Sequence, residues 1–227
     1  MTLQHVDIVF QLIVFLLAIS VHESAHAWMA NRLGDPTARM LGRVSLNPIK
    51  HIDPVGTILL PAIALFAHIP MLGWAKPTPV NPRNFRNPVR DDILTSVAGP
   101  VSNFLLASIA LVAMAFVKFA SPLGNQTISG IPYGMIDLGT NSPLIPVCLL
   151  LYELMVINVV LGVFNLIPVP PLDGSHVLRH FLPTGALRIY DTVGGFALMA
   201  LVFLGGGILG KIIYPVLGIF NSILSRI

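Results

Sequence analysis

Charge is the scarcest property of this 227-residue chain. Only 10% of its residues are charged, 13 basic and 10 acidic, whereas an ordinary soluble domain is about 25% charged. Because 55% of the residues are hydrophobic, so few charges could not solvate the surface of a soluble globule. The composition therefore excludes a soluble domain, a disordered chain and a nucleic-acid-binding protein. It predicts an integral membrane protein.

Cysteine and glutamate are also nearly absent. The single cysteine, Cys148, excludes an internal disulfide framework. Only two glutamates occur, Glu23 and Glu153, and both lie inside apolar runs. An acidic side chain in a membrane segment is costly unless it is partnered or hydrated, so it marks a functional site by default.

Long apolar runs predict the membrane-spanning elements. Each clear run is long enough to cross a hydrocarbon layer of about 30 Å. The runs lie at 8–31, 93–117 and 144–167, and two further helices are expected after 186, with a break near the glycines at 205–207. The predicted fold class is an all-α membrane protein, a polytopic helical bundle of about five to six membrane segments. We expect one integral-membrane domain over 1–227, with its core at 8–181 and C-terminal helices at 186–227.

The apolar segment 54–72 contains three prolines and leaves two interpretations open. It either enters the membrane and returns on the same side, or crosses as a plain Pro-containing helix. Seven basic residues lie within 33–91, and none within 1–31 or 119–178. Because basic loops face the cytoplasm, we expect 33–91 there, and the N-terminus and the 121–143 loop outside. This distribution of charge agrees with the expected orientation only if the segment 54–72 does not cross the membrane.

A Pro- and Asn-rich connector follows at 72–92. Its prolines remove backbone donors and disfavour a long helix, so short edge-type strands or turns fit better. Such an edge could receive an unwound substrate, and a plain surface loop is the alternative. Further along the chain, Asp173 is expected to cap a short helix that runs through Phe181.

The first apolar run contains HESAH, an HExxH motif formed by His22, Glu23 and His26. Residues four apart lie on one face of a helix, so both imidazoles can reach one metal ion. The glutamate beside the first histidine can then take a proton from a water that the metal activates. The alternative is a set of satisfied polar residues between packed helices. The placement of the motif inside a membrane helix favours the metal site.

A catalytic zinc ion needs three protein ligands, and HExxH supplies two. Asp173, which follows the third clear span, is the leading candidate for the third, although its Asp-Gly-Ser context also suits a helix cap. His176 and His180, also four apart, could form a second metal pair. They lack an adjacent glutamate, so a solvated helix end is favoured for them.

Four motifs together resemble the site-2 proteases, which are intramembrane zinc metalloproteases. HESAH in a first membrane helix and NLIPVPPLDG closing a later one are similar to the motifs of that family. GPVSN at 99–103 resembles its GPxxN motif. GWAKP at 73–77, followed by VNP at 80–82, resembles the connector of a compact bacterial subgroup. The resemblance spans residues 8–181.

The resemblance implies a role for each matching residue. The family's metal ligands map onto His22, His26 and Asp173, and its general base maps onto Glu23. Its active-site asparagine, which helps to hold the substrate or the oxyanion, maps onto Asn165. The implied cofactor is Zn²⁺, and the implied activity is hydrolysis of peptide bonds within or near transmembrane segments in regulated intramembrane proteolysis. No room is expected for a PDZ domain or a nucleotide-sensing CBS domain.

The expected partners are the transmembrane segment of a membrane-protein substrate and the lipid bilayer, and no nucleic acid. The oligomeric state stays open. The expected location is the bacterial inner membrane, with the active site in the cytoplasmic third. A metal transporter and a catalytically silent chaperone for transmembrane helices are the alternatives. A single ligand cluster argues against a metal transporter. An intact HExxH motif with Asp173 argues against a catalytically silent chaperone.

Overall fold

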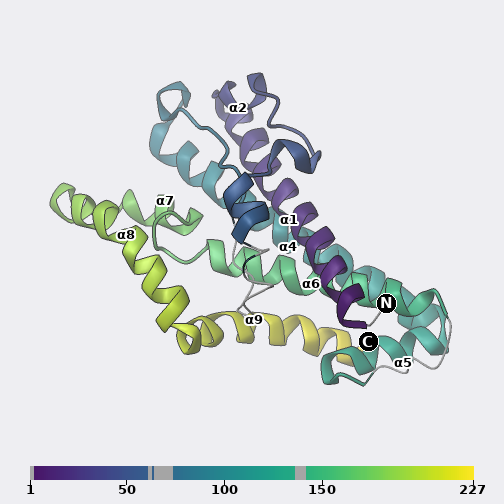
Figure 1. The fold of residues 1–227 in the computed structure, drawn as a ribbon. Helices are drawn as coiled ribbons and strands as arrows, with labels where there is room; N and C mark the ends of the chain where they lie inside the picture. The colour runs from purple at the N-terminus through teal and green to yellow at the C-terminus, as the bar shows by residue number, and fades with distance from the viewer. Residues whose placement is uncertain (1–2, 61–62, 64–73, 136–141) are drawn as a thin grey trace.

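The computed structural model is a helical bundle centred on one long helix, α4 (Figure 1). It describes residues 3–60, 63, 74–135 and 142–227. The bundle consists of α1 (Leu3–Leu33), α4 (Pro88–Ala120) and α6 (Leu144–Asn165), and each of these helices contacts the other two. Helix α4 therefore lies against both partners along the middle of the molecule.

The remaining elements are shorter or lie at the ends of the bundle. The helices are α2 (Thr37–Met40), α5 (Pro122–Gly130), α7 (Asp173–Arg179), α8 (Thr184–Leu204) and α9 (Gly206–Arg226). The single turns are η1 (Pro48–Lys50), η2 (Pro54–Leu59), η3 (Pro82–Asn84) and η4 (Ile131–Tyr133). The described residues contain no strand.

Within the described residues, five helices are long and apolar enough to cross a membrane: α1 from Val9, α4, α6, α8 and α9. The chain is a multi-pass membrane protein, and the predicted all-α fold class is confirmed. The predicted break near 205–207 is also confirmed, because α8 ends at Leu204 and α9 begins at Gly206.

Helix α4 has one face that packs in the bundle and an opposite face that is exposed. Its large residues Leu105, Ile109, Val112 and Phe116 recur on one face and are exposed. The opposite face buries the small residues Ala107 and Ala110 together with Asn103 and Met114. Small residues let membrane helices approach closely, and polar ones then bond across the contact. This packing brings α1 and α6 together against α4.

One expectation for the connecting segments was wrong, and the 72–92 connector shows the expected turns, such as η3, in place of strands. The 121–143 stretch is not simply a loop, because Ser121 caps the nine-residue helix α5 by accepting a hydrogen bond from the Gly124 amide, and Pro122 occupies its first turn. The described part of the 72–92 connector, from Trp74 onward, forms no strand. Its backbone is instead bonded to a neighbouring segment: the Trp74 amide donates to Gly56, and the Lys76 amide to His51.

The segment 54–72 is described only at Pro54–Leu60 and Ile63, and Pro54–Leu59 forms one π-helical turn. Whether the segment returns or crosses therefore lies outside the described residues.

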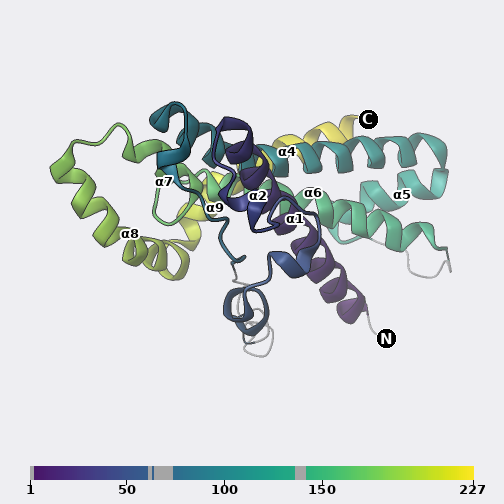
Figure 2. The same cartoon turned by 90° about the horizontal axis from the view of Figure 1, so that it is seen from above.

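Helices α8 and α9 form an arm beside the bundle. Both views place α8 to the side, beyond α7 (Figures 1 and 2). Helix α9 returns to pack against α6, and the Lys118 ammonium near the end of α4 donates to the Leu224 carbonyl near the end of α9 at 2.8 Å. The last turn of α9 thus lies beside the last turn of α4.

Candidate metal centre

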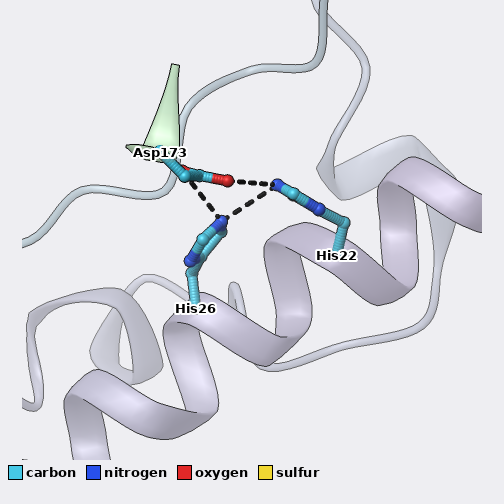
Figure 3. A group of neighbouring side chains, drawn as sticks. All are labelled: His22, His26 and Asp173. Atoms are coloured by element: carbon cyan, nitrogen blue, oxygen red, sulfur yellow. Dashed lines mark hydrogen bonds and ion pairs between the residues drawn. The ribbon is translucent and has the colours of Figure 1, made fainter. Parts of the chain in front are cut away.

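Three side chains predicted to bind metal converge at one point. His22 and His26 lie one turn apart on α1, and Asp173 is the first residue of α7 (Figure 3). The two imidazole Nε2 atoms are 3.0 Å apart, and the Asp173 carboxylate oxygens lie 3.1 Å from His22 Nε2 and 3.4 Å from His26 Nε2. Both histidines are buried. Among the described residues, this is the one His/Cys/Asp/Glu group whose ligand atoms all lie within 4.8 Å of one another.

Hydrogen bonds fix the tautomer of both imidazoles. His26 Nδ1 faces the Thr95 carbonyl oxygen at 2.7 Å, and His22 Nδ1 faces the Asn103 side-chain oxygen at 2.6 Å. Both partners accept, so each Nδ1 carries the proton and donates it. Each Nε2 of the neutral ring therefore presents a lone pair toward the other and toward Asp173. Such a convergence of lone pairs is repulsive unless a cation lies between them.

The geometry fits zinc. Tetrahedral zinc with ligands at about 2.0–2.1 Å separates those ligands by about 3.3 Å, close to the three separations observed here. The Asp173 Oδ2 atom is buried and receives no hydrogen bond within the described chain, so it is free to bind a metal. Two neutral imidazoles and one carboxylate suit zinc better than magnesium or calcium.

The carboxylate of Asp173 faces the histidines instead of capping its helix. The N-cap of α7 is Leu172, and no side chain caps the helix, so the expected capping role for Asp173 was wrong. A carboxylate binds a metal ion in its ionised form, and this orientation turns the Asp173 oxygens toward the space between the two imidazoles.

Helix α4 supports both histidines from behind. Thr95, Gly99 and Asn103 are spaced four apart and so lie on one face of the helix. Thr95 and Asn103 accept from the two imidazoles, and a Cβ atom at Gly99 would lie only 2.3 Å from His26 Nε2. Asn103 is itself oriented because its amide donates to Asn158 of α6 at 2.8 Å. The motif GPVSN included Asn103, whereas Thr95 was missed because a backbone carbonyl leaves no signal in residue type.

Glu23 lies beside His22 and is held by the connector. The Thr78 amide and hydroxyl donate to Glu23 Oε2 at 2.8 and 2.7 Å. The buried Arg43 guanidinium holds the same stretch by donating to the carbonyls of Lys76 and Pro77. These contacts join residues more than 30 positions apart, so no local pattern could indicate a role for Thr78 or Arg43.

Asn165 lies at the last position of α6, and its amide donates to the Leu161 carbonyl on the same helix at 3.0 Å. Within the described residues, no hydrogen bond links it to the three ligands, so its catalytic role stays a prediction. His176 and His180 lie near Asp92 of α4 instead of forming a metal cluster of their own.

A buried His–His–Asp cluster with a glutamate beside the first histidine, set among membrane-length helices, defines the class of membrane metalloenzymes. The family model described as peptidase family M50 matches residues 10–204. The chain therefore belongs to peptidase family M50 and is a membrane metalloprotease.

Named relatives agree with this assignment. The chain is 38% identical over 176 residues to "Putative zinc metalloprotease YwhC" of Bacillus subtilis (strain 168), covering 78% of this chain and 70% of the relative. It is 28% identical over 169 residues to "Putative zinc metalloprotease Rip2" of Mycolicibacterium smegmatis, covering 74% of this chain and 55% of the relative. It is 24% identical over 177 residues to "Zinc metalloprotease MJ0392" of Methanocaldococcus jannaschii, covering 77% of this chain and 35% of the relative.

The chain thus spans about two thirds of the length of YwhC and about half or less of the other two relatives. No solved structure matches it. The donor set, the family and the names of these relatives agree on Zn²⁺ as the cofactor.

Proposed function

We propose that the chain is an intramembrane zinc metalloendopeptidase that hydrolyses peptide bonds within or near transmembrane segments of membrane proteins, in regulated intramembrane proteolysis. The observation that carries the proposal is the convergence of His22, His26 and Asp173, with Glu23 adjacent, inside a helix of membrane length. A polar cluster of this kind is costly in a membrane unless it has a function.

Each residue has a defined task in this reaction. His22, His26 and Asp173 hold the zinc ion, which when bound polarises the scissile carbonyl and acidifies a water molecule. Glu23 accepts a proton from that water and delivers it to the leaving amine. Its Oε2 atom accepts from the Thr78 amide and hydroxyl, so Thr78 orients the carboxylate. Asn165 would hold the substrate or the oxyanion.

A substrate segment must expose its scissile carbonyl to the metal centre. A helical substrate hides its carbonyls in its own hydrogen bonds, so it must unwind locally before cleavage. Residues that destabilise a helix should therefore promote cleavage of a substrate.

The proposed orientation places the active site in the cytoplasmic third of a bacterial inner membrane, with the N-terminus outside. His26 lies two turns before the end of α1 at Leu33, and Asp173 follows the end of α6 at Asn165. The end of α1 continues into the basic 33–91 stretch, and Asp173 meets the α1 histidines, so both ends are proposed to face the cytoplasm. A cysteine at the exposed position Arg39 should resist an impermeant thiol reagent applied to intact cells. Labelling of that cysteine from outside would overturn the orientation.

Replacing Glu23 by Gln tests the mechanism directly. Glutamine keeps the size of glutamate but cannot accept the proton, so zinc occupancy should survive while cleavage of a model transmembrane substrate falls by about 10⁴-fold or more. Asn165→Ala should keep partial activity and full zinc, because at most one or two hydrogen bonds are lost. Near-normal cleavage by Glu23→Gln would overturn the proposed mechanism, and unchanged metal flux into vesicles would point to a transporter.

A further inference from the structure

The helix that supplies the third metal ligand cannot hold its own position. Helix α7 has only seven residues, and no side chain caps its first turn. Isolated helices shorter than about 12–15 residues are marginal even with favourable sequences. The Asp173 carboxylate therefore lies between the two histidines because something outside α7 fixes the helix.

A buried acidic residue on α4 binds the other end of α7. Asp92 is 8% exposed, and its Oδ2 atom lies 2.7 Å from His180 Nε2 and 3.6 Å from His176 Nδ1. A buried carboxylate is costly unless it is paired, and removing one partner of such a pair is strongly destabilising. The contact therefore constrains where α7 can lie against α4.

A second ion pair on the same helix is of a different kind. Arg179 of α7 and Asp191 of α8 are 3.2 Å apart, but their side chains are 37% and 48% exposed. Exposed ion pairs contribute little to stability, because solvent screens them. Arg179–Asp191 therefore adds little to the position of α7, and it provides a matched control for Asp92.

Asp92 continues the face of α4 that already supports both histidines. Its spacing of three residues from Thr95 places it on the same face as Gly99 and Asn103. Asn103 and Thr95 orient His22 and His26, and Asp92 reaches α7, which carries the third ligand. Helix α4 thus contacts both histidines directly and reaches the third ligand through α7.

We propose that Asp92 is a positioning residue of the metal centre: by binding His180, with His176 beside it, Asp92 holds α7 against α4 and so keeps Asp173 between His22 and His26. This inference rests on the proposed zinc site. It assigns to His180 a task that does not involve binding metal. The two parts of the anchor, Asp92 and His180, act as a unit.

Zinc affinity of the full chain in detergent, measured by competition with a chelator, tests the proposal. Loss of a residue that orients a metal ligand typically weakens metal binding 10–100-fold. We expect Asp92→Ala and His180→Ala each to weaken zinc binding by about 10-fold or more, and the double variant to be no weaker than either. Asp92→Asn should lose less, because its amide oxygen still accepts from His180. Asp191→Ala should match the wild type.

The outcomes separate this inference from the proposed function. A wild-type chain that binds no zinc contradicts the proposed function. A wild-type chain that binds zinc, with Asp92→Ala or His180→Ala binding it equally tightly, contradicts the positioning role alone. Additive losses in the double variant would also contradict it. If Asp92→Ala does not fold, as judged by size-exclusion behaviour and thermal unfolding of the metal-free protein, His180→Ala and Asp92→Asn decide the question by the same measurement.

Discussion

The bundle and the C-terminal arm use similar apolar residues in opposite ways. On α4, eleven residues are buried, and they include Asp92, Thr95 and Asn103, all bonded to neighbouring elements. On α8 and α9, the buried residues are only Gly194 and Leu224. Apolar packing and polar bonds across close helix contacts together hold the bundle, whereas the arm presents most of its surface outward.

This difference indicates which elements of the molecule determine the geometry of the metal centre. Every ligand, and every residue that orients a ligand, lies in α1, α4, α6 or α7 or on the connector. The arm meets the bundle through apolar packing of α9 on α6 and at points such as Gly194 against Pro170, away from the ligands. Equivalent substitutions in the two regions should then have very different effects on zinc binding.

The largest difference is expected for aspartate. Asp173→Ala removes a metal ligand and should abolish cleavage and weaken zinc binding severely, because a catalytic zinc needs three protein ligands. Asp191→Ala, on α8, removes one partner of an exposed ion pair and should leave zinc content unchanged. Elemental analysis of both purified variants measures the comparison. Full zinc occupancy in Asp173→Ala would remove Asp173 from the ligand set.

The sequence alone predicted those features that depend on residues close together in the chain. Apolar length predicted the five long helices, and the four-residue spacing of His22 and His26 predicted that both could reach one ion. Asp173 was harder, because a local rule made it a helix cap, whereas the structure turns its carboxylate toward the histidines. Only contact between α7 and α1 decides between the two, and no local pattern records that contact.

The supporting residues could not be predicted for the same reason. Thr78 meets Glu23 across 55 positions, and Asp92 meets His180 across 88. Each is an ordinary polar residue in its own segment. The helix α5 was missed for a different reason: its Gly and Pro content suggested a loop, whereas Ser121 and Pro122 form a helix start.

Glycine should give the next largest difference. A Cβ at Gly99 would lie 2.3 Å from His26 Nε2 and 2.6 Å from His22 Nε2, so Gly99→Ala must displace both imidazoles or shift α4. We expect zinc affinity to fall by at least about 100-fold, at the upper end of what disturbed ligand orientation costs. In the arm, a Cβ at Gly195 meets nothing within 4 Å. Gly195→Ala should keep zinc affinity and stabilise α8 by up to about 1 kcal/mol.

Chelator competition and thermal unfolding of both glycine variants check this prediction. Equal zinc affinity in Gly99→Ala and Gly195→Ala would mean that α4 does not back the histidines as closely as the structure indicates.

Asparagine should give the smallest difference, because the bundle residue acts through a single hydrogen bond. Asn103→Leu removes the acceptor of the His22 Nδ1 proton and frees that imidazole to change tautomer. We expect zinc binding to weaken about 10-fold, near the lower end of the usual range for a residue that orients a ligand. Asn158→Leu acts one step further away, because it removes the partner of the Asn103 amide, so its effect should be smaller.

The matched residue in the arm is Asn221, whose oxygen accepts from the Tyr152 hydroxyl at 3.3 Å between α9 and α6. Asn221→Leu should leave zinc affinity unchanged, because no chain of hydrogen bonds leads from it to a ligand among the described residues. If the loss of zinc affinity falls in the order Asn103, Asn158, Asn221, the hydrogen bonds that run from α6 through Asn103 to His22 support the metal centre. An equal loss in all three variants would show that they act by general destabilisation.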